Sequence, residues 1–439
     1  MPSIEPFRFL HTGDLHLDSP VAGLSSEAPP ELFRVLRDAT TDAWRAVVRT
    51  AIEEHCEFVV IAGDVFEGAS PTLMGQTRFR DGLAELAAAG IGSFVVHGNH
   101  DPMDGRSWTP SLDFPPAVHR FGTAPGESVP VVRDGREIAR IHGRSYPRAA
   151  VTENYAARFR ADPAAPFSIG LLHTNLGDRP GHANYAPCSA RDLRASGMNY
   201  WALGHIHQPG RVLDDPVAVY CGIPQGRDPG ELGARGCWVV DVDGARRVTP
   251  RFVATDVVRW QPLEVGIGDL EDDEALRRAC REAIGAAVDD ADGRSLMVRV
   301  RLTGRGPLHA NVNRPGYLAQ LRELLDEERS AAPPFAWIES VRAATRPAVD
   351  LDARREAPDF VGDFLRMVAA ARRSETTTDP EEHERWQELL RSAIAPLYDE
   401  SQRGRRHLTR PPDEALVDEL LDEAEAAGMD LLLAAEESR

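Results

Sequence analysis

Several features that mark particular protein classes are missing from this 439-residue sequence. It has no apolar run of roughly 18 residues, the length that a membrane-spanning helix needs. Its start, MPSIEPFRFLHTGDLH, has neither the basic segment nor the apolar core of a signal peptide. The few cysteines form no CxxC pair and are odd in number: Cys56, Cys188, Cys221, Cys237 and Cys280. We therefore predict no disulfide framework, no zinc ribbon and no membrane association, and we expect a cytoplasmic protein.

Lysine is also absent, so that all 50 basic side chains are arginine. Arginine can bind a carboxylate or a phosphate through two parallel hydrogen bonds, but a bias in codon composition explains the pattern more simply. The sequence contains no glycine-rich loop of the P-loop kind, so we do not expect this chain to hydrolyse ATP.

The net charge of −19 and the pI of about 5.2 argue at first sight against a nucleic-acid partner. The charge is unevenly distributed, however. The last 90 residues contain 23 acidic side chains and 12 arginines, which gives −11 for that segment alone. The charge of the whole chain is therefore a weak guide to the character of a site elsewhere.

Five short apolar segments in the first 255 residues each run directly into polar residues that can bind metals. These segments are Phe7–Leu10, Phe58–Ala62, Gly92–Val96, Phe167–Leu172 and Tyr200–Leu203. Continuous apolar runs are typical of strands that are buried on both faces, with helices such as Leu32–His55 and Gln76–Ala89 outside them. Sites in such sheets lie at the carboxyl ends of the strands, so we expect the five strand ends to converge on one site.

The pattern changes after residue 255. Strand-like and helical stretches alternate in the order β-α-β-α-β, which predicts a separate small α/β domain over residues 256–348. Residues 349–439 are predicted to be helical and acidic, with apolar side chains at helical spacing. The predicted division is thus 1–255, 256–348 and 349–439.

The polar residues at the five strand ends form a mixed set of oxygen and nitrogen donors. They are Asp14, His16, Asp64, Asn99, His173, His205 and His207. Such a set suits Mn²⁺, Fe²⁺ or Zn²⁺ better than Ca²⁺. With neutral imidazoles the two carboxylates leave a pair of divalent ions positively charged, which favours a phosphate substrate. Two ions about 3.5–4 Å apart can activate a shared water and bind both the attacking and the leaving oxygen. Asp64, alone after its strand, is the natural bridge.

The combination resembles the calcineurin-like metallophosphoesterases. The motifs are D-x-H (Asp14, His16), GD (Gly63, Asp64), GNHD (98–101), the single His173, and GHIH (204–207). The resemblance implies that one metal is bound by Asp14, His16, Asp64 and His207, and the other by Asp64, Asn99, His173 and His205. It also implies that His100 stabilises the leaving oxygen and that Asp101 orients His100.

Longer segments, among them FRFLHTGDLHLDSPVAGL and YCGIPQGRDPGELGARGC, resemble the bacterial YhaO-type DNA repair exonucleases, which are related to SbcD. This resemblance covers roughly residues 7–255. It implies a two-sheet α/β sandwich with helices outside, a small capping domain that helps to hold DNA, and a C-terminal region that docks to a coiled-coil (SMC-like) ATPase. Ile223 departs from the polar residue expected in that loop.

Four further residues are candidates for substrate binding: His182, Arg227, Arg299 and Arg301. Each has an alternative explanation: a solvated loop histidine for His182, the fixing of its own loop for Arg227, and a solvated strand face for the other two. His11 and His97 flank the ligand motifs, but we expect them to pack against strands.

Our leading hypothesis is a two-metal phosphodiesterase, specifically a Mn²⁺-dependent DNA exonuclease or endonuclease in DNA repair. The alternative is a phosphatase or a small-molecule phosphodiesterase of the same superfamily, because fold and metals do not fix the substrate. A regulatory subunit with a vestigial site is disfavoured, because all seven ligand positions and His100 are intact. The sequence leaves open whether the chain forms a homodimer.

Overall fold

The computed structural model describes residues 3–19, 30–68, 72–104, 113–177, 183–327, 334–349 and 351–375, together with residues 384, 388, 392, 428 and 429. The chain divides into two compact units. The first comprises residues 1–265, 277–301 and 318–342, and the second residues 266–276, 302–317 and 343–439. Among the described residues, no helix has the length and apolar character needed to cross a membrane. The domain boundaries at 255 and 348 stay predictions.

The first six-stranded sheet has the order β12-β11-β1-β2-β3-β4. Its central strands β1 (Phe7–Thr12), β2 (Phe58–Ala62) and β3 (Gly92–Val96) are parallel, as is the short β4 (Val118–Arg120). The strands β11 (Gly236–Val242) and β12 (Val248–Ala254) add an antiparallel edge. Every residue of β2 is buried, as its unbroken apolar sequence predicts.

The second six-stranded sheet has the order β5-β6-β7-β8-β10-β9. Its parallel centre consists of β6 (Arg136–Gly143), β7 (Ser168–His173), β8 (Tyr200–Gly204) and β10 (Val217–Tyr220). The strands β5 (Ser128–Arg133) and β9 (Gly210–Asp214) pair antiparallel at its edges. A short 3-10 helix (Ala156–Arg158) and α3 (Ala190–Ala195) lie in its connections.

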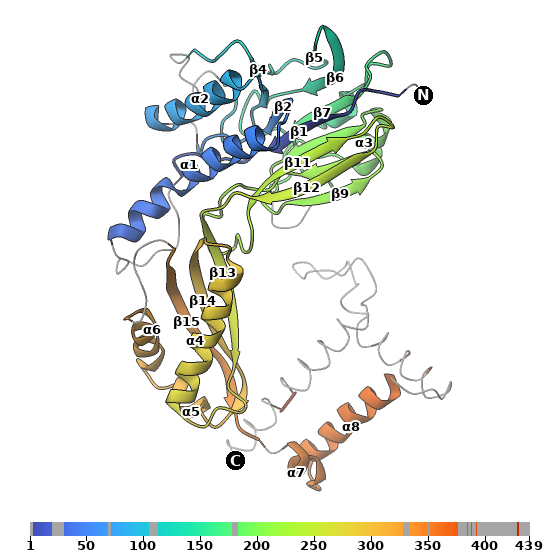
Figure 1. The fold of residues 1–439 in the computed structure, drawn as a ribbon. Helices are drawn as coiled ribbons and strands as arrows, with labels where there is room; N and C mark the ends of the chain where they lie inside the picture. Colours follow the sequence, from blue (N-terminus) through green and yellow to red (C-terminus); the bar gives the residue numbers. More distant parts are fainter. Residues whose placement is uncertain are drawn as a thin grey trace. The chain divides into compact units, whose positions relative to one another are not determined.

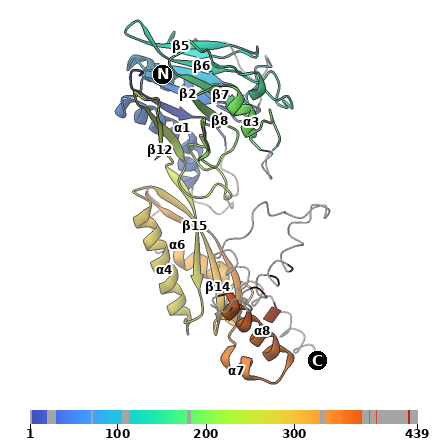
Figure 2. The same cartoon turned by 90° about the vertical axis from the view of Figure 1, so that its right-hand side faces the viewer.

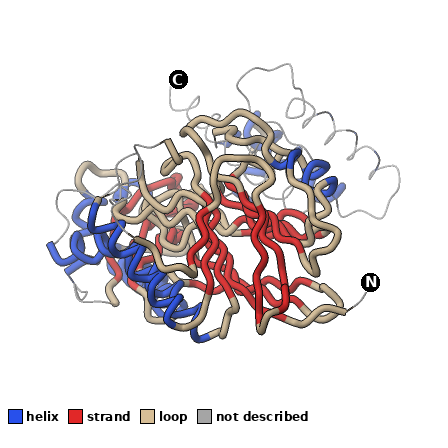
Figure 3. Tube along the Cα trace, turned by 90° about the horizontal axis from the view of Figure 1, so that it is seen from above, coloured by secondary structure: helices blue, strands red, loops and turns tan. Residues whose placement is uncertain are grey.

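Apolar side chains from both sheets form one core between them, with Phe9 and Phe58 stacked 5.0 Å apart and Phe9 edge-on to Tyr200. The other face of the first sheet packs against the helices α1 (Pro30–Glu53) and α2 (Leu73–Ala88), whose Trp44 and Phe79 are buried there. Figures 1 and 3 show these helices outside the sheets. The predicted two-sheet α/β sandwich is confirmed.

The β-α-β-α-β segment is also confirmed. Its three strands are β13 (Val258–Gly266), β14 (Ser295–Gly306) and β15 (Ala336–Pro347), which form a sheet in that order. The described parts of its connections contain the helices α4 (Asp273–Asp290), α5 (His309–Val312) and α6 (Tyr317–Glu327). Figure 2 shows α4 running along this sheet.

Among the described residues, two further helices follow the three-stranded sheet. They are α7 (Leu351–Glu356) and α8 (Phe360–Glu375), which confirm the helical prediction for the start of the C-terminal region. Apart from the five single residues named above, the chain beyond residue 375 lies outside the described residues.

Candidate metal centre

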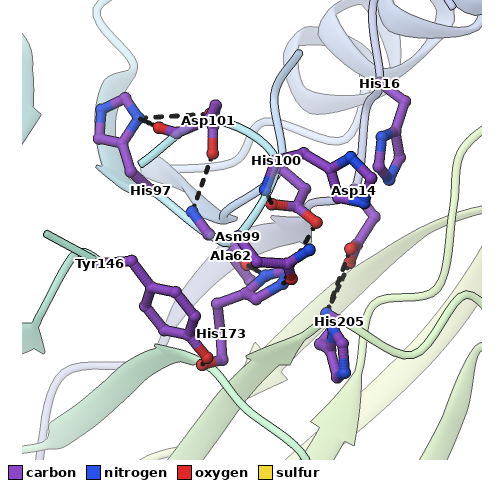
Figure 4. Close-up of polar contacts among 12 residues, drawn as sticks. Asp14, His16, Ala62, His97, Asn99, His100, Asp101, Tyr146, His173 and His205 are labelled. Atoms are coloured by element: carbon purple, nitrogen blue, oxygen red, sulfur yellow. Dashed lines mark hydrogen bonds and ion pairs between the residues drawn. The ribbon is translucent and has the colours of Figure 1, made fainter. Parts of the chain in front are cut away.

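The structure brings the seven predicted ligands together from the ends of parallel strands. Asp14 and His16 follow β1, Asp64 follows β2, and Asn99 follows β3. His173 is the last residue of β7, and His205 and His207 follow β8. Because β1 to β3 belong to one sheet and β7 and β8 to the other, the site lies where the same ends of both sheets meet. Figure 4 shows the labelled members of this set gathered in one region.

One group of potential ligand atoms belongs to Asp14, His16 and His207, which all lie within 4.8 Å of one another. The Nε2 atoms of His16 and His207 are 3.2 Å apart. The Nδ1 atom of His16 lies 2.7 Å from a carboxylate oxygen of Glu67, and that of His207 lies 2.6 Å from one of Glu231. A carboxylate at Nδ1 favours the proton there, which leaves the Nε2 lone pairs facing each other. This arrangement fits a cation.

A second group consists of Asp14, Asp64 and His173. The ring of His173 donates from Nδ1 to the Ala62 carbonyl at 2.9 Å, and its Nε2 lies 2.9 Å from Oδ1 of Asn99 and 3.3 Å from Asp64. Three atoms with lone pairs thus converge, which again fits a metal ion. Asp14 belongs to both groups, so the bridging role of Asp64 stays a prediction.

The imidazole of His205 is oriented by a backbone contact. Its Nε2 donates to the Ala183 carbonyl at 2.8 Å, and its ring centroid lies 5.2 Å from that of His173. Its backbone N–H donates to the Asp14 carboxylate at 3.0 Å. The contact at Nε2 assigns the lone pair to Nδ1, the atom that would bind a metal.

Four of the seven predicted ligands have a left-handed backbone. The φ angles are 48° for Asp14, 42° for His16, 49° for Asp64 and 95° for His205. Non-glycine residues rarely adopt this conformation, which costs on the order of 1–3 kcal/mol at each position and is concentrated at functional sites. Six other described residues outside the ligand set also have positive φ, so this backbone strain accompanies the ligand motifs without being confined to them.

Two motif glycines are required because other groups approach them closely. A Cβ atom on Gly98 would lie 2.3 Å from the Asp64 carboxylate, and one on Gly204 would lie 2.0 Å from the Ala62 carbonyl. The Ala62 carbonyl is also the acceptor that holds His173. Glycine at these places allows the strand ends to come close enough to share a site.

Burial and neighbouring charge act against each other in this centre. Burial would raise the pKa of Asp64, but the charges of His173 and His16 hold it below its ordinary value. Burial would lower the pKa of His173, but Asp64 and Asp14 raise it to about 9. The pKa of Asp14 is raised, chiefly by burial. The carboxylates thus favour the protonated, positively charged form of the His173 imidazole. A bound metal would supply the positive charge in its place and would displace that proton.

His100 lies beside this centre, and its ring centroid is 4.9 Å from that of His16. Its side chain is 36% exposed, and its backbone N–H donates to Asp64 at 2.9 Å. Its Nδ1 lies 3.1 Å from Glu67, whose carboxylate raises the pKa of His100. The ring therefore lies next to the ligand set with part of its surface open to solvent.

The predicted contact between Asp101 and His100 is wrong. Asp101 is fully buried and accepts hydrogen bonds from the backbone N–H groups of Gly98 at 2.8 Å and Val65 at 3.0 Å, and it lies 3.3 Å from Nδ1 of His97 (Figure 4). Asp101 accepts from these backbone N–H groups because Val65 and Gly98 are buried and their donors need an acceptor. It ties the GNHD loop to the residue after Asp64, and Glu67 is the carboxylate beside His100.

Arg227 fixes its own loop, one of the two roles considered for it. Its side chain is 13% exposed, and its Nη1 lies 2.5 Å from Glu67 and 2.8 Å from Oγ of Ser19. Its backbone N–H donates to Glu231 at 2.6 Å. Sequence reasoning missed both glutamates. Glu67, three residues after Asp64, offered only its nearness to the GD motif as a signal.

The two arginine candidates of β14 have acidic partners on their own sheet. Arg299 pairs with Glu339 through contacts of 2.6 and 3.1 Å, and Arg301 pairs with Glu264 at 3.2 Å, so both form ion pairs on their sheet. His182 lies outside the described residues. His11 is fully buried and contacts the Tyr200 hydroxyl at 3.0 Å, as expected for a packed histidine.

Residues 7–209 match the calcineurin-like phosphoesterase family, and residues 260–346 match the middle domain of metallophosphoesterase YhaO. Metallophosphoesterase YhaO of Bacillus subtilis is 35% identical over 75% of this chain and 79% of that protein. A subunit of the nuclease SbcCD of Bacillus subtilis is 26% identical over 58% of this chain and 72% of that protein. The DNA double-strand break repair protein Mre11 of Aeropyrum pernix is 29% identical over 60% of this chain and 64% of that protein. The chain thus belongs to the YhaO family of calcineurin-like metallophosphoesterases, which hydrolyse phosphoesters at a two-metal centre.

Proposed function

We propose that this phosphoesterase is a Mn²⁺-dependent DNA exonuclease or endonuclease that acts in DNA repair. The observation that carries the proposal is the convergence of seven ligand-type side chains from two sheets, with the half-exposed His100 beside them. The relatives named as a nuclease subunit and as a DNA double-strand break repair protein support DNA as the substrate. The segment that matches the YhaO middle domain supports a larger substrate, because a minimal phosphatase does not need it.

In the proposed centre Asp14, His16, Asp64 and His207 hold one ion, and Asp64, Asn99, His173 and His205 hold the other. Bound divalent ions would supply a hydroxide nucleophile at neutral pH and neutralise the charge on the phosphoryl oxygens. The protein contributes the rigid placement of the donors. The Ala62 and Ala183 carbonyls and the Glu67 and Glu231 carboxylates orient the four histidine rings from behind.

His100 is proposed to act on the leaving group. With Nδ1 directed at Glu67, Nε2 is the ring atom that remains to meet the substrate, and it can give a proton to the sugar oxygen as the P–O bond breaks. Its partial exposure fits a group that must meet substrate, in contrast to the fully buried His16.

The proposed partners are DNA and a coiled-coil (SMC-like) ATPase. The chain itself offers no P-loop, so an ATP-driven step would need a second protein. The region 349–439 is the proposed docking segment. Its helix α8 has Phe360 73% exposed and Met367 62% exposed, and such apolar side chains are typical of a helix that binds a partner.

The test uses the purified chain with Mn²⁺, end-labelled single- and double-stranded DNA, and a simple phosphomonoester. The Asp64→Asn and His100→Ala variants are assayed in parallel. We expect cleavage of DNA by the wild type, loss of activity and of metal in Asp64→Asn, and a fall of about 10²–10⁴-fold in His100→Ala with both ions retained. Cleavage of the monoester alone would refute the nuclease proposal in favour of a phosphatase.

A further inference from the structure

Glu67 joins a proposed metal ligand to the proposed leaving-group histidine. It lies in the loop after β2, three residues beyond Asp64, and its two carboxylate oxygens contact two different imidazoles. We propose that Glu67 is a positioning residue that fixes the metal-binding face of His16 and the proton-transfer face of His100 at once. This inference rests on the proposed function, since it assigns a role within the same site.

The first contact orients His16. The Nδ1 atom of its fully buried ring lies 2.7 Å from Oε2 of Glu67. The contact is a close ion pair rather than an aligned hydrogen bond, and the negative charge beside Nδ1 favours a proton on that atom. The lone pair is then on Nε2, which lies 3.2 Å from Nε2 of His207 where a metal would bind. A carboxylate behind the ring also makes the imidazole a more basic ligand.

The second contact orients His100. Its Nδ1 lies 3.1 Å from Oε1 of the same carboxylate. This contact directs Nε2 away from Glu67, as proton transfer to a leaving oxygen requires. The rings of His16 and His100 stand nearly perpendicular, at 82°, with their centroids 4.9 Å apart. One carboxylate can therefore reach the Nδ1 atoms of both rings.

Glu67 is itself held in place. Nη1 of Arg227, from the loop after β10, lies 2.5 Å from the oxygen that faces His16, and the same nitrogen contacts Ser19 at 2.8 Å. The guanidinium is 13% exposed, so solvent screens this pair weakly. The anchored carboxylate has little freedom to leave either ring, which distinguishes it from a surface glutamate that happens to touch a histidine.

A direct metal ligand is the competing role for Glu67, because its atoms and those of His16 and His100 lie within 4.8 Å of one another. The geometry favours positioning. Glu67 contacts Nδ1 of His16, whereas Nε2 of that ring faces His207. A third ion bound at Nδ1 of His16 would displace the proton from that atom. His16 would then no longer have the tautomer with the proton on Nδ1 and the lone pair on Nε2, which metal binding beside His207 requires.

The experiment compares Glu67→Gln with Glu127→Gln in the full chain. Glu127 is a matched control, because it pairs with His119 at 2.8 Å, has similar exposure, and lies just before β5, remote from the ligand motifs in the sequence. Mn²⁺ binding to the metal-free proteins is measured by titration calorimetry, and ion stoichiometry by elemental analysis. We expect the Glu67 variant to bind one of two ions about 10–100-fold more weakly, and the control to match the wild type.

Turnover is measured with two phosphodiesters, one with a nitrophenolate and one with an alkoxide leaving group. Glu67→Gln should lose more rate on the alkoxide substrate than on the nitrophenolate substrate. In a protein that already carries His100→Ala, this difference between the two substrates should be smaller. Two ions bound with wild-type affinity, or an equal loss on both substrates, would overturn the proposal. If the wild type binds three ions and Glu67→Gln binds two, Glu67 is a direct metal ligand and the positioning role is refuted.

Two further controls keep the outcome clear. Should Glu67→Gln fail to fold by circular dichroism, Glu67→Asp replaces it, since a shorter carboxylate keeps the charge but cannot reach both rings. We then expect weaker Mn²⁺ binding or a selective loss on the alkoxide substrate, and wild-type values of both would refute the role. A wild type that cleaves the model diesters but not DNA would refute the DNA proposal, while the calorimetry would still test Glu67.

Discussion

His11 precedes the D-x-H motif in β1, and the pH dependence of stability tests whether it is a buried structural histidine rather than a metal ligand. Its ring is fully buried between the sheets, and burial lowers its pKa from 6.5 to about 3. Because the folded-state pKa lies below the unfolded one, the unfolded chain takes up the proton first as the pH falls. The contribution to stability is thus fully present above pH 6.5 and is progressively lost between 6.5 and about 3.

The magnitude follows from these two values. Between about pH 7.5 and about pH 5 the unfolded imidazole becomes almost fully protonated while the folded one stays neutral, which costs about 2 kcal/mol of folding free energy. The His11→Asn variant, which retains a polar group near the Tyr200 hydroxyl, should lose about 2 kcal/mol less than the wild type over the same interval.

The assay is urea unfolding at both pH values with a chelator present, so that metal binding does not contribute. His55→Asn, at an exposed position with positive φ that asparagine tolerates, is the control variant, because it removes a histidine without disturbing the core. Mn²⁺ affinity of His11→Asn should also match the wild type. If the two variants lose equal stability on acidification, or if His11→Asn no longer binds Mn²⁺, the assignment of His11 as a packed structural histidine is refuted.

Three further predictions concern Gly204, the two arginines of β14 and the binding of Mn²⁺. Gly204→Ala places a methyl group against the Ala62 carbonyl and should weaken Mn²⁺ binding at least tenfold by calorimetry; an unaffected affinity would contradict the close approach. Arg299→Ala removes the guanidinium that pairs with the mostly buried Glu339 and should destabilise the fold by about 1–3 kcal/mol in urea. Arg301→Ala, in an exposed pair, should change stability by less than about 0.5 kcal/mol. Adding Mn²⁺ at about 100 times its dissociation constant should stabilise the metal-free protein by about 2.7 kcal/mol per site, seen as a higher midpoint in thermal unfolding that a chelator reverses.

The sequence predicted the sheets and the gathering of the ligands because both depend on local signals. Unbroken apolar runs such as Phe58–Ala62 mark buried parallel strands, and the residue after such a strand must lie at the sheet edge. The positions of Asp64 and His173 follow from this rule alone. Their metal-binding role stays a prediction that the geometry favours.

The orienting carboxylates could not be predicted in the same way. Glu67 and Glu231 lie in loops, and their contacts with His16 and His207 depend on loop conformation rather than on spacing. Asp101 shows the converse error: it adjoins His100 in the sequence, yet its side chain turns to backbone donors because those are the buried groups that need an acceptor. Adjacency in the sequence is a poor guide to which carboxylate orients a histidine.

The loop around Ile223 shows how a departure from the expected sequence can leave a site intact. A polar residue was expected there, but the Ile223 side chain is fully buried and its carbonyl accepts from the Gly236 N–H at 3.1 Å, so an apolar side chain suits this position. The polar contacts of this loop are made two and four residues later. Buried Gln225 accepts from the Val257 N–H at 2.9 Å and donates to the Val258 carbonyl at 2.6 Å, and Arg227 holds Glu67. Because Gln225 and Arg227 fix the loop, an isoleucine in place of a polar residue at position 223 should leave the orientation of the metal-binding histidines unchanged.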